Sequence, residues 1–153
     1  MLMSNEDAIS VLNDLIETCK GGQEGFQTAA QAVTRADLKV LFTDLYQQRI
    51  EFISMLQEHL LRLGGDPTQN GNGCNGAFQR GWKNIETAVK EGDDDAIIAE
   101  CGRGEDYAIN SYQDALKVGL PADLAELVNN QQMKIKSALE SIKGFEKTNV
   151  IRA

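Results

Sequence analysis

Residues 36–67 read ADLKVLFTDLYQQRIEFISMLQEHLLRLGGDP. Core-type positions in this stretch recur at alternating spacings of four and three residues, which is the heptad pattern of a helix buried along one side. The stretch ends in Gly64-Gly65 and Pro67, because glycine supplies a left-handed cap and proline cannot continue a helix. The pattern predicts a helix over 36–64. Its stripe consists of Leu38, Phe42, Leu45, Arg49, Phe52, Leu56, His59 and Leu63.

Three further segments carry the same stripe of core-type residues. They predict helices over 5–34, 94–118 and 121–147. Ser4 is a good N-cap for the first of these helices, and Pro121 is acceptable in the first turn of the last one. The chain is therefore expected to be all-α, with four long helices.

A long connection, residues 65–93, separates the second long helix from the third. Residues 76–90 within it predict a short amphipathic helix. Phe78 and Trp82 lie on its apolar side, where they form either a lid packed on the bundle or a surface for a small ligand or partner. The other connections are very short, so each helix pair is an antiparallel hairpin. Two hairpins joined by one long crossover predict a single domain, 1–153, that is a four-helix bundle of ferritin-like topology.

Composition excludes several classes of function. The chain has 15 Lys and Arg against 23 Asp and Glu, a formal net charge of −8, which disfavours nucleic acid as a partner. No apolar run approaches the roughly 20 residues that a membrane-spanning helix needs, and the N-terminus has no signal-peptide pattern. The three cysteines, Cys19, Cys74 and Cys101, lack paired CxxC spacing. We therefore expect a cytoplasmic protein with free thiols, with Cys74 exposed in a Gly/Asn-rich loop.

Several short motifs follow one another along nearly the whole chain. They are Ile16-Glu17-Thr18-Cys19-Lys20, Gly25-Phe26, Gln47-Gln48-Arg49, Leu63-Gly64-Gly65-Asp66-Pro67, Arg80-Gly81-Trp82, and Glu100-Cys101 with Gly104-Glu105-Asp106. Through these motifs the chain resembles a bacterial family of short, uncharacterised four-helix-bundle proteins assigned to the ferritin-like superfamily. The resemblance implies this fold in a bacterial, cytoplasmic setting, and it implies no activity.

The ligand pattern of a di-iron centre is missing from the sequence. Ferritin-like di-iron proteins use one Glu from each of two helices and a Glu-x-x-His pair from each of the others. The single histidine, His59, follows Leu56 rather than Glu at that spacing, and we expect it to be a core or bundle-end residue. Glu24, Glu51 and Glu105 stay as candidates for a carboxylate-only metal site, although solvated charged faces explain them more simply.

Polar residues occupy positions in the stripes where Leu or Ile is expected. Arg49 and Gln131 are the clearest cases, and a buried guanidinium must be paired because a stranded charge costs several kcal/mol. We expect Arg49 to pair with Glu105 and the glutamines, Gln48 and Gln131, to complete a polar layer that sets helix register. The alternative is that Arg49 extends outward between helices.

Three glycines interrupt the interior of the first predicted helix. Gly21, Gly22 and Gly25 each cost about 0.8–1 kcal/mol relative to alanine in such a position. Either a neighbouring element approaches this helix closely, or the helix contains a local bulge. A bulge would turn Glu24 inward.

These features lead to three hypotheses of function. The favoured one is a non-catalytic structural, stress-related or protein-interaction bundle without a di-iron centre or other cofactor, forming a homodimer or binding another protein. The second is a metal-binding or oxidoreductase protein with a degenerate carboxylate site. The third is a carrier of small apolar ligands. The residues favour a protein that is not an enzyme, because no nucleophile and base are paired in any motif.

Overall fold

The computed structural model describes residues 3–67 and 74–152, including their side chains except those of 74–75 and 147–152. This part of the chain forms six helices and no strand. It is all-α, as predicted. The helices are α1 (Asn5–Ala32), α2 (Ala36–Arg62), α3 (Cys74–Gly81), α4 (Ile85–Glu91), α5 (Asp94–Leu116) and α6 (Ala122–Arg152).

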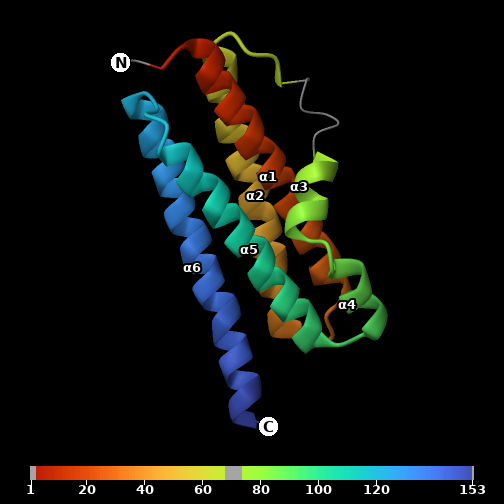
Figure 1. The fold of residues 1–153 in the computed structure, drawn as a ribbon. Coiled ribbons are helices and arrows are strands. Elements are labelled where there is room, and N and C mark those ends of the chain that lie inside the picture. Colours follow the sequence, from red (N-terminus) through yellow and green to blue (C-terminus); the bar gives the residue numbers. More distant parts are fainter. Residues whose placement is uncertain (1–2, 68–73, 153) are drawn as a thin grey trace.

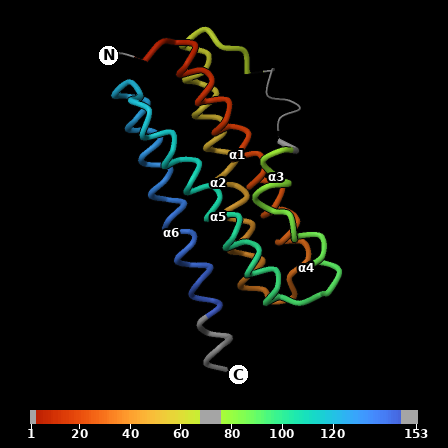
Figure 2. Tube along the Cα trace, viewed as in Figure 1, coloured from red at the N-terminus to blue at the C-terminus, as the bar shows by residue number. Residues whose placement is uncertain are grey.

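Four long helices form two hairpins that lie against each other (Figure 1). Helix α1 packs along α2, and α5 packs along α6, while α1 and α5 join the two hairpins. Helices α2 and α6 meet at few places. The trace in Figure 2 shows the short α3 and α4 beside α1 and α5, on the side of the bundle away from α6.

The crossover contains two short helices rather than the single helix predicted over 76–90. The chain turns between α3 and α4 at Trp82, whose side chain is buried. The carboxylate of Glu100, which reaches over from α5, accepts a hydrogen bond from the Asn84 amide at 2.5 Å. Asn84 precedes the first residue of α4, so a carboxylate from another helix satisfies one of the free amides at this helix start. The break is thus a tertiary feature that helical periodicity does not encode.

The buried glycines make room for the indole of Trp82. A Cβ atom on Gly25 of α1 or on Gly104 of α5 would lie 2.3 Å from an indole carbon. Gly21 meets the backbone of α3 in the same way, with its Cβ position 3.1 Å from the Phe78 amide nitrogen. Helix α1 is unbroken through these positions, so the alternative of a local bulge is wrong, and Glu24 is exposed. Close approach of the crossover explains the glycines.

The apolar core consists of two clusters stacked along the bundle. One contains Leu12, Phe52 and Tyr112, and the other contains Phe26 and Trp82. On α1, α2 and α5 the residues of the two clusters do not overlap along the helix. Polar and small residues fill this boundary. They are Gly22 on α1, Arg49 on α2 and Glu105 on α5.

Asp94 links the two hairpins by hydrogen bonds at one end of the bundle. Its carboxylate accepts hydrogen bonds from the Thr34 amide and hydroxyl, both at 2.9 Å, and from the Arg35 amide at 3.1 Å. These donors lie in the turn between α1 and α2, whereas Asp94 is the first residue of α5. None of the described helices is both long and apolar enough to cross a membrane.

Candidate functional site

The strongest polar interaction in the core joins Arg49 and Glu105. Nη1 of Arg49 donates to Oε1 of Glu105 at 2.7 Å, and Nη2 donates to Oε2 at 2.5 Å. The side chains are 1% and 0% exposed, respectively. A bidentate pair of this kind requires an ionised carboxylate, because a protonated one would turn a donor toward a donor.

Neighbouring groups shape the space around the Arg49 guanidinium. A Cβ atom on Gly22 would lie 3.1 Å from Nη1, so the glycine leaves room for the charged group. The rings of Phe26 and Phe52 lie 5.2 and 5.8 Å from its central carbon, within cation–π range. Nε donates to Gln48 Oε1 at 3.4 Å. The charge is therefore enclosed by a carboxylate, two aromatic rings and an amide.

Burial and pairing act in opposite directions on the pKa values of this pair. Burial raises the pKa of Glu105 above its ordinary value, and the charge of Arg49 opposes that rise. Burial acts to lower the pKa of Arg49, but the Glu105 carboxylate outweighs it and the pKa is raised. Because the guanidinium does not deprotonate in proteins, Arg49 is a fixed cation.

A second chain of hydrogen bonds begins at Cys19. Its Sγ lies 3.0 Å from the Tyr112 hydroxyl, which donates to Gln131 Oε1 at 2.7 Å. A phenol has one proton, so the Cys19 thiol must be the donor to Tyr112. The Gln131 amide in turn donates to the Phe52 carbonyl at 3.4 Å. The direction of the whole chain is therefore fixed.

The thiol at the start of this chain stays protonated at neutral pH. Burial raises the pKa of Cys19 to about 11, and it raises the pKa of Tyr112 well above its ordinary value. A nucleophilic cysteine needs a lowered pKa and an adjacent base. Neither condition holds at Cys19, so this geometry does not activate it.

Every fully buried side-chain nitrogen or oxygen in the described part of the chain has a hydrogen-bond partner. Both Glu105 oxygens are occupied by Arg49. The described residues contain no group of three or more His, Cys, Asp or Glu side chains arranged to hold a metal ion. The hydrogen-bonding groups of the buried centre are thus paired within the described part of the chain.

The structure separates the other predicted site residues from this centre. Glu24 and Glu51 are exposed on outer helix faces, so neither joins Glu105 as a metal ligand. Gln131 belongs to the second chain of hydrogen bonds through its hydrogen bond with Tyr112, whereas Gln48 lies half-buried beside Arg49. His59 is half-buried near the end of α2. The exposure expected for Cys74 lies outside the described side chains.

Sequence reasoning missed Tyr112 and the role of Cys19. The four-and-three spacing in the third long helix predicts a stripe through Gly104 and Ser111, but Glu105 and Tyr112 are also buried and Ser111 is only half-buried. Positions 101, 105, 108, 112 and 115 repeat with the same spacing as the predicted stripe, so periodicity allowed both. Helix α5 buries a broad face rather than a narrow seam, so residues from both sets are buried.

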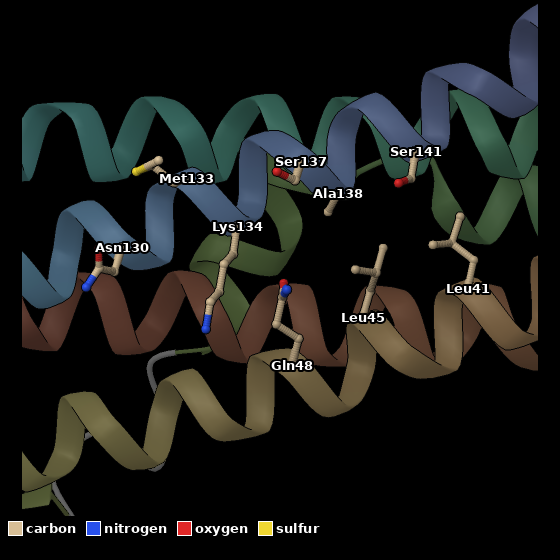
Figure 3. Close-up of a pocket in the computed structure, with 9 residues that line it drawn as sticks. All are labelled: Leu41, Leu45, Gln48, Asn130, Met133, Lys134, Ser137, Ala138 and Ser141. Atoms are coloured by element: carbon tan, nitrogen blue, oxygen red, sulfur yellow. The ribbon is translucent and has the colours of Figure 1, made fainter.

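A hollow of about 240 Å³ at the surface is lined by Phe78 and Trp82, where the ligand-surface alternative would need one, and two larger hollows lie elsewhere. One is a groove of about 600 Å³ between α2 and α6 (Figure 3). The other, of about 370 Å³, lies between α1, α3 and α5, where the Arg80 guanidinium donates to the Tyr107 hydroxyl at 2.9 Å. Trp82 itself is 3% exposed and belongs to the second apolar cluster, with Phe78 partly buried against that cluster.

Comparison with known proteins gives a family without an assigned activity. A domain of unknown function, DUF2383, matches residues 7–118, which run from α1 to just past the end of α5. No curated protein matches the chain. The matched segment holds Cys19, Arg49, Glu105 and Tyr112, while Gln131 lies beyond it. Since the match covers most of the sequence, the chain belongs to the DUF2383 family.

Proposed function

We propose that this protein is a non-catalytic helical bundle of ferritin-like topology that serves as a structural or stress-related protein-interaction module. The observation that carries the proposal is the bidentate Arg49–Glu105 pair, fully buried at the boundary of two apolar clusters. Ferritin-like metal centres place carboxylates in the bundle interior to hold cations. Here the cation is supplied by a guanidinium of the chain itself.

The chemistry of the remaining interior groups supports a structural role. Cys19 is a protonated donor, Tyr112 donates a hydrogen bond to Gln131, and no imidazole takes part. The hydrogen bonds from Gln131 and Tyr112 join α5, α6, α1 and α2 at one level, which opposes sliding of one helix along another. Buried polar groups of this kind are best known for setting helix register.

A bacterial, cytoplasmic setting belongs to the same proposal. Cys19 and Cys101 are both free thiols, which suits a reducing compartment.

Elemental analysis of protein purified without chelators tests the proposal directly. We expect iron, manganese and zinc well below one atom per chain, both as purified and after incubation with Fe(II) or Mn(II) followed by desalting. Stoichiometric metal that disappears in E105Q would overturn the proposal, because it would assign Glu105 to a metal rather than to Arg49. The exposed E51Q variant is the matched control, since it removes a carboxylate that lies outside the buried centre.

A further inference from the structure

The groove between α2 and α6 is an open seam in the bundle. Leu41, Leu45 and Gln48 point into it from α2, and Lys134 and Ala138 point into it from α6 (Figure 3). The groove exists because α2 and α6 meet at few places while each packs closely within its own hairpin. Its α6 wall is completed by Asn130, Met133, Ser137 and Ser141.

Two exposed methionines lie on the groove side of the helices that form this groove. Of the six large hydrophobic residues exposed in the described part of the chain, Val40, Ile50 and Leu61 project from other faces of α2, whereas Met55 and Met133 lie on the groove side. Met133 lines the groove and is 59% exposed, and Met55, 44% exposed, lies seven residues beyond Gln48 on the same side of α2. Flexible methionines are common on surfaces that receive helices.

The α2 edge of the groove is acidic. Asp44 lies three residues after Leu41 and four before Gln48, and Glu51 lies three after Gln48 and four before Met55, so these side chains are neighbours on the helix surface. Both carboxylates are exposed, and neither forms an ion pair in the described part of the chain. The next acidic residues in this row of α2 form ion pairs with arginines. Asp37 pairs with Arg35 at 2.8 Å, and Glu58 pairs with Arg62 at 2.7 Å.

This distribution of charge discriminates between possible occupants. A second copy that packed its α2 against this α2 would bring Asp44 and Glu51 close to like charges, in a chain that already carries a net charge of −8. An anionic surface meets the same repulsion. A partner helix with a row of basic residues beside its apolar stripe would complement the acidic edge of α2. Its apolar side chains would fill the groove. Lys134, the one charged residue lining the groove, requires a neutral or acidic flank on the opposite side of that helix.

From these observations we infer that the α2–α6 groove receives an amphipathic helix of a partner protein, with its basic flank on α2. The inference rests on the proposed interaction function and specifies its partner. The α6 wall runs from residue 130 to residue 141, about 16 Å at the rise of an α-helix, which is the length of about three turns of an occupant.

The probe is a designed, fluorescein-labelled helical peptide of Leu, Lys and Glu, with Lys confined to one flank and Glu to the other. Fluorescence anisotropy with the full chain should show saturable binding. The double variant D44K/E51K should weaken binding by about tenfold or more, because it turns an attractive edge into a repulsive one. Ser137→Phe, which places a ring in the groove at an exposed position, should weaken binding without changing any charge.

The matched control is E24K/E86K, which alters net charge equally at exposed positions on α1 and α4. It should bind as the unaltered protein does. Equal losses in both double variants, or no binding to the unaltered protein, would overturn the inference. Sedimentation of the protein alone supplies a further arm, since dimers that S137F abolishes would assign the groove to a second copy. None of these outcomes changes the metal content, so the proposed metal-free bundle stands or fails separately.

Discussion

Arg49 and Glu105 meet across the interior of the bundle, from helices that do not run alongside each other. Arg49 belongs to α2 and Glu105 to α5, and these helices are neighbours of α1 rather than of one another. Their two parallel hydrogen bonds therefore span the core between its two apolar clusters. The energetic consequence is asymmetric, because removal of one partner leaves the other charge buried and unpaired.

This asymmetry is measurable by urea unfolding followed by circular dichroism. R49M or E105L alone should lower the free energy of unfolding by about 3–5 kcal/mol. The double variant R49M/E105L, which removes both charges, should recover most of that loss. Glu58 and Arg62 form an exposed pair at 2.7 Å, and R62A should change stability by at most about 0.5 kcal/mol. Additive losses in the R49M/E105L cycle would show that the two residues do not interact.

Two glycines of α5 predict opposite effects of the same substitution, glycine to alanine. G104A places a Cβ atom 2.3 Å from the rigid indole, so it should destabilise the protein by about 2 kcal/mol or more through overpacking. In the same helix, a Cβ atom on Gly102 finds its nearest neighbour at 3.9 Å, so G102A should stabilise by about 0.5–1 kcal/mol. Thermal unfolding of both variants checks the pair. A neutral G104A would mean that the crossover does not dock as described.

Asp94 should make stability depend on pH in the acid range. Burial acts to raise the pKa of Asp94, but hydrogen bonds from Thr34 and Arg35 outweigh it, so the pKa is lowered from its ordinary value. A lowered folded-state pKa means that the stabilisation is present above the unfolded-state value and is lost as pH falls through the folded-state value.

D94A should therefore cost about 1–2 kcal/mol at neutral pH, as for loss of a helix cap. The difference between D94A and the unaltered protein should shrink as pH falls below about 4. Urea unfolding across this range measures it. The control is D44N, which changes an exposed mid-helix carboxylate without such hydrogen bonds. A D94A deficit that persists unchanged in acid would contradict the role assigned to the ionised carboxylate.

Thiol labelling should distinguish the native from the unfolded chain. Burial raises the pKa of Cys19 to about 11 and that of Cys101 well above its ordinary value, and the side chains are 1% and 0% exposed. In a C74S background the folded protein should react negligibly with an aromatic disulfide reagent at neutral pH. Two thiols should react once urea unfolds it. Rapid labelling of the folded C74S protein would show that the core opens readily.

The long helices were predictable because heptad spacing depends only on which residues are buried along one face. The first three ended up to two residues earlier than predicted, at the turns after Ala32, Arg62 and Leu116. Periodicity does not locate such ends, because the flanking residues continue a helical pattern while hydrogen bonds in the turn have already ended it. The break at Trp82 depends on glycines and a carboxylate from other helices, and no local pattern contains that information.

The buried centre was predictable to the extent that a charged residue in an apolar stripe demands a partner. In the structure Arg49 pairs with Glu105, as predicted, but the sequence did not mark Tyr112 as a buried residue. A tyrosine at a helix position consistent with either of two stripes carries no signal of burial until the packing is known. Cys19 likewise reads as a small apolar residue from sequence alone, and its role as a donor depends on the phenol beside it.

Trp82 is the single tryptophan of the chain, and its ring lies edge-on to Phe26 at 4.9 Å where α1, α5 and the crossover converge. The protein thus carries an intrinsic optical reporter at one junction. Its fluorescence emission reports whether the crossover is packed on the bundle, whereas far-ultraviolet circular dichroism is dominated by the long helices. If the two signals separate during unfolding, the crossover leaves before the bundle melts, and the two motions can be timed without attaching any label.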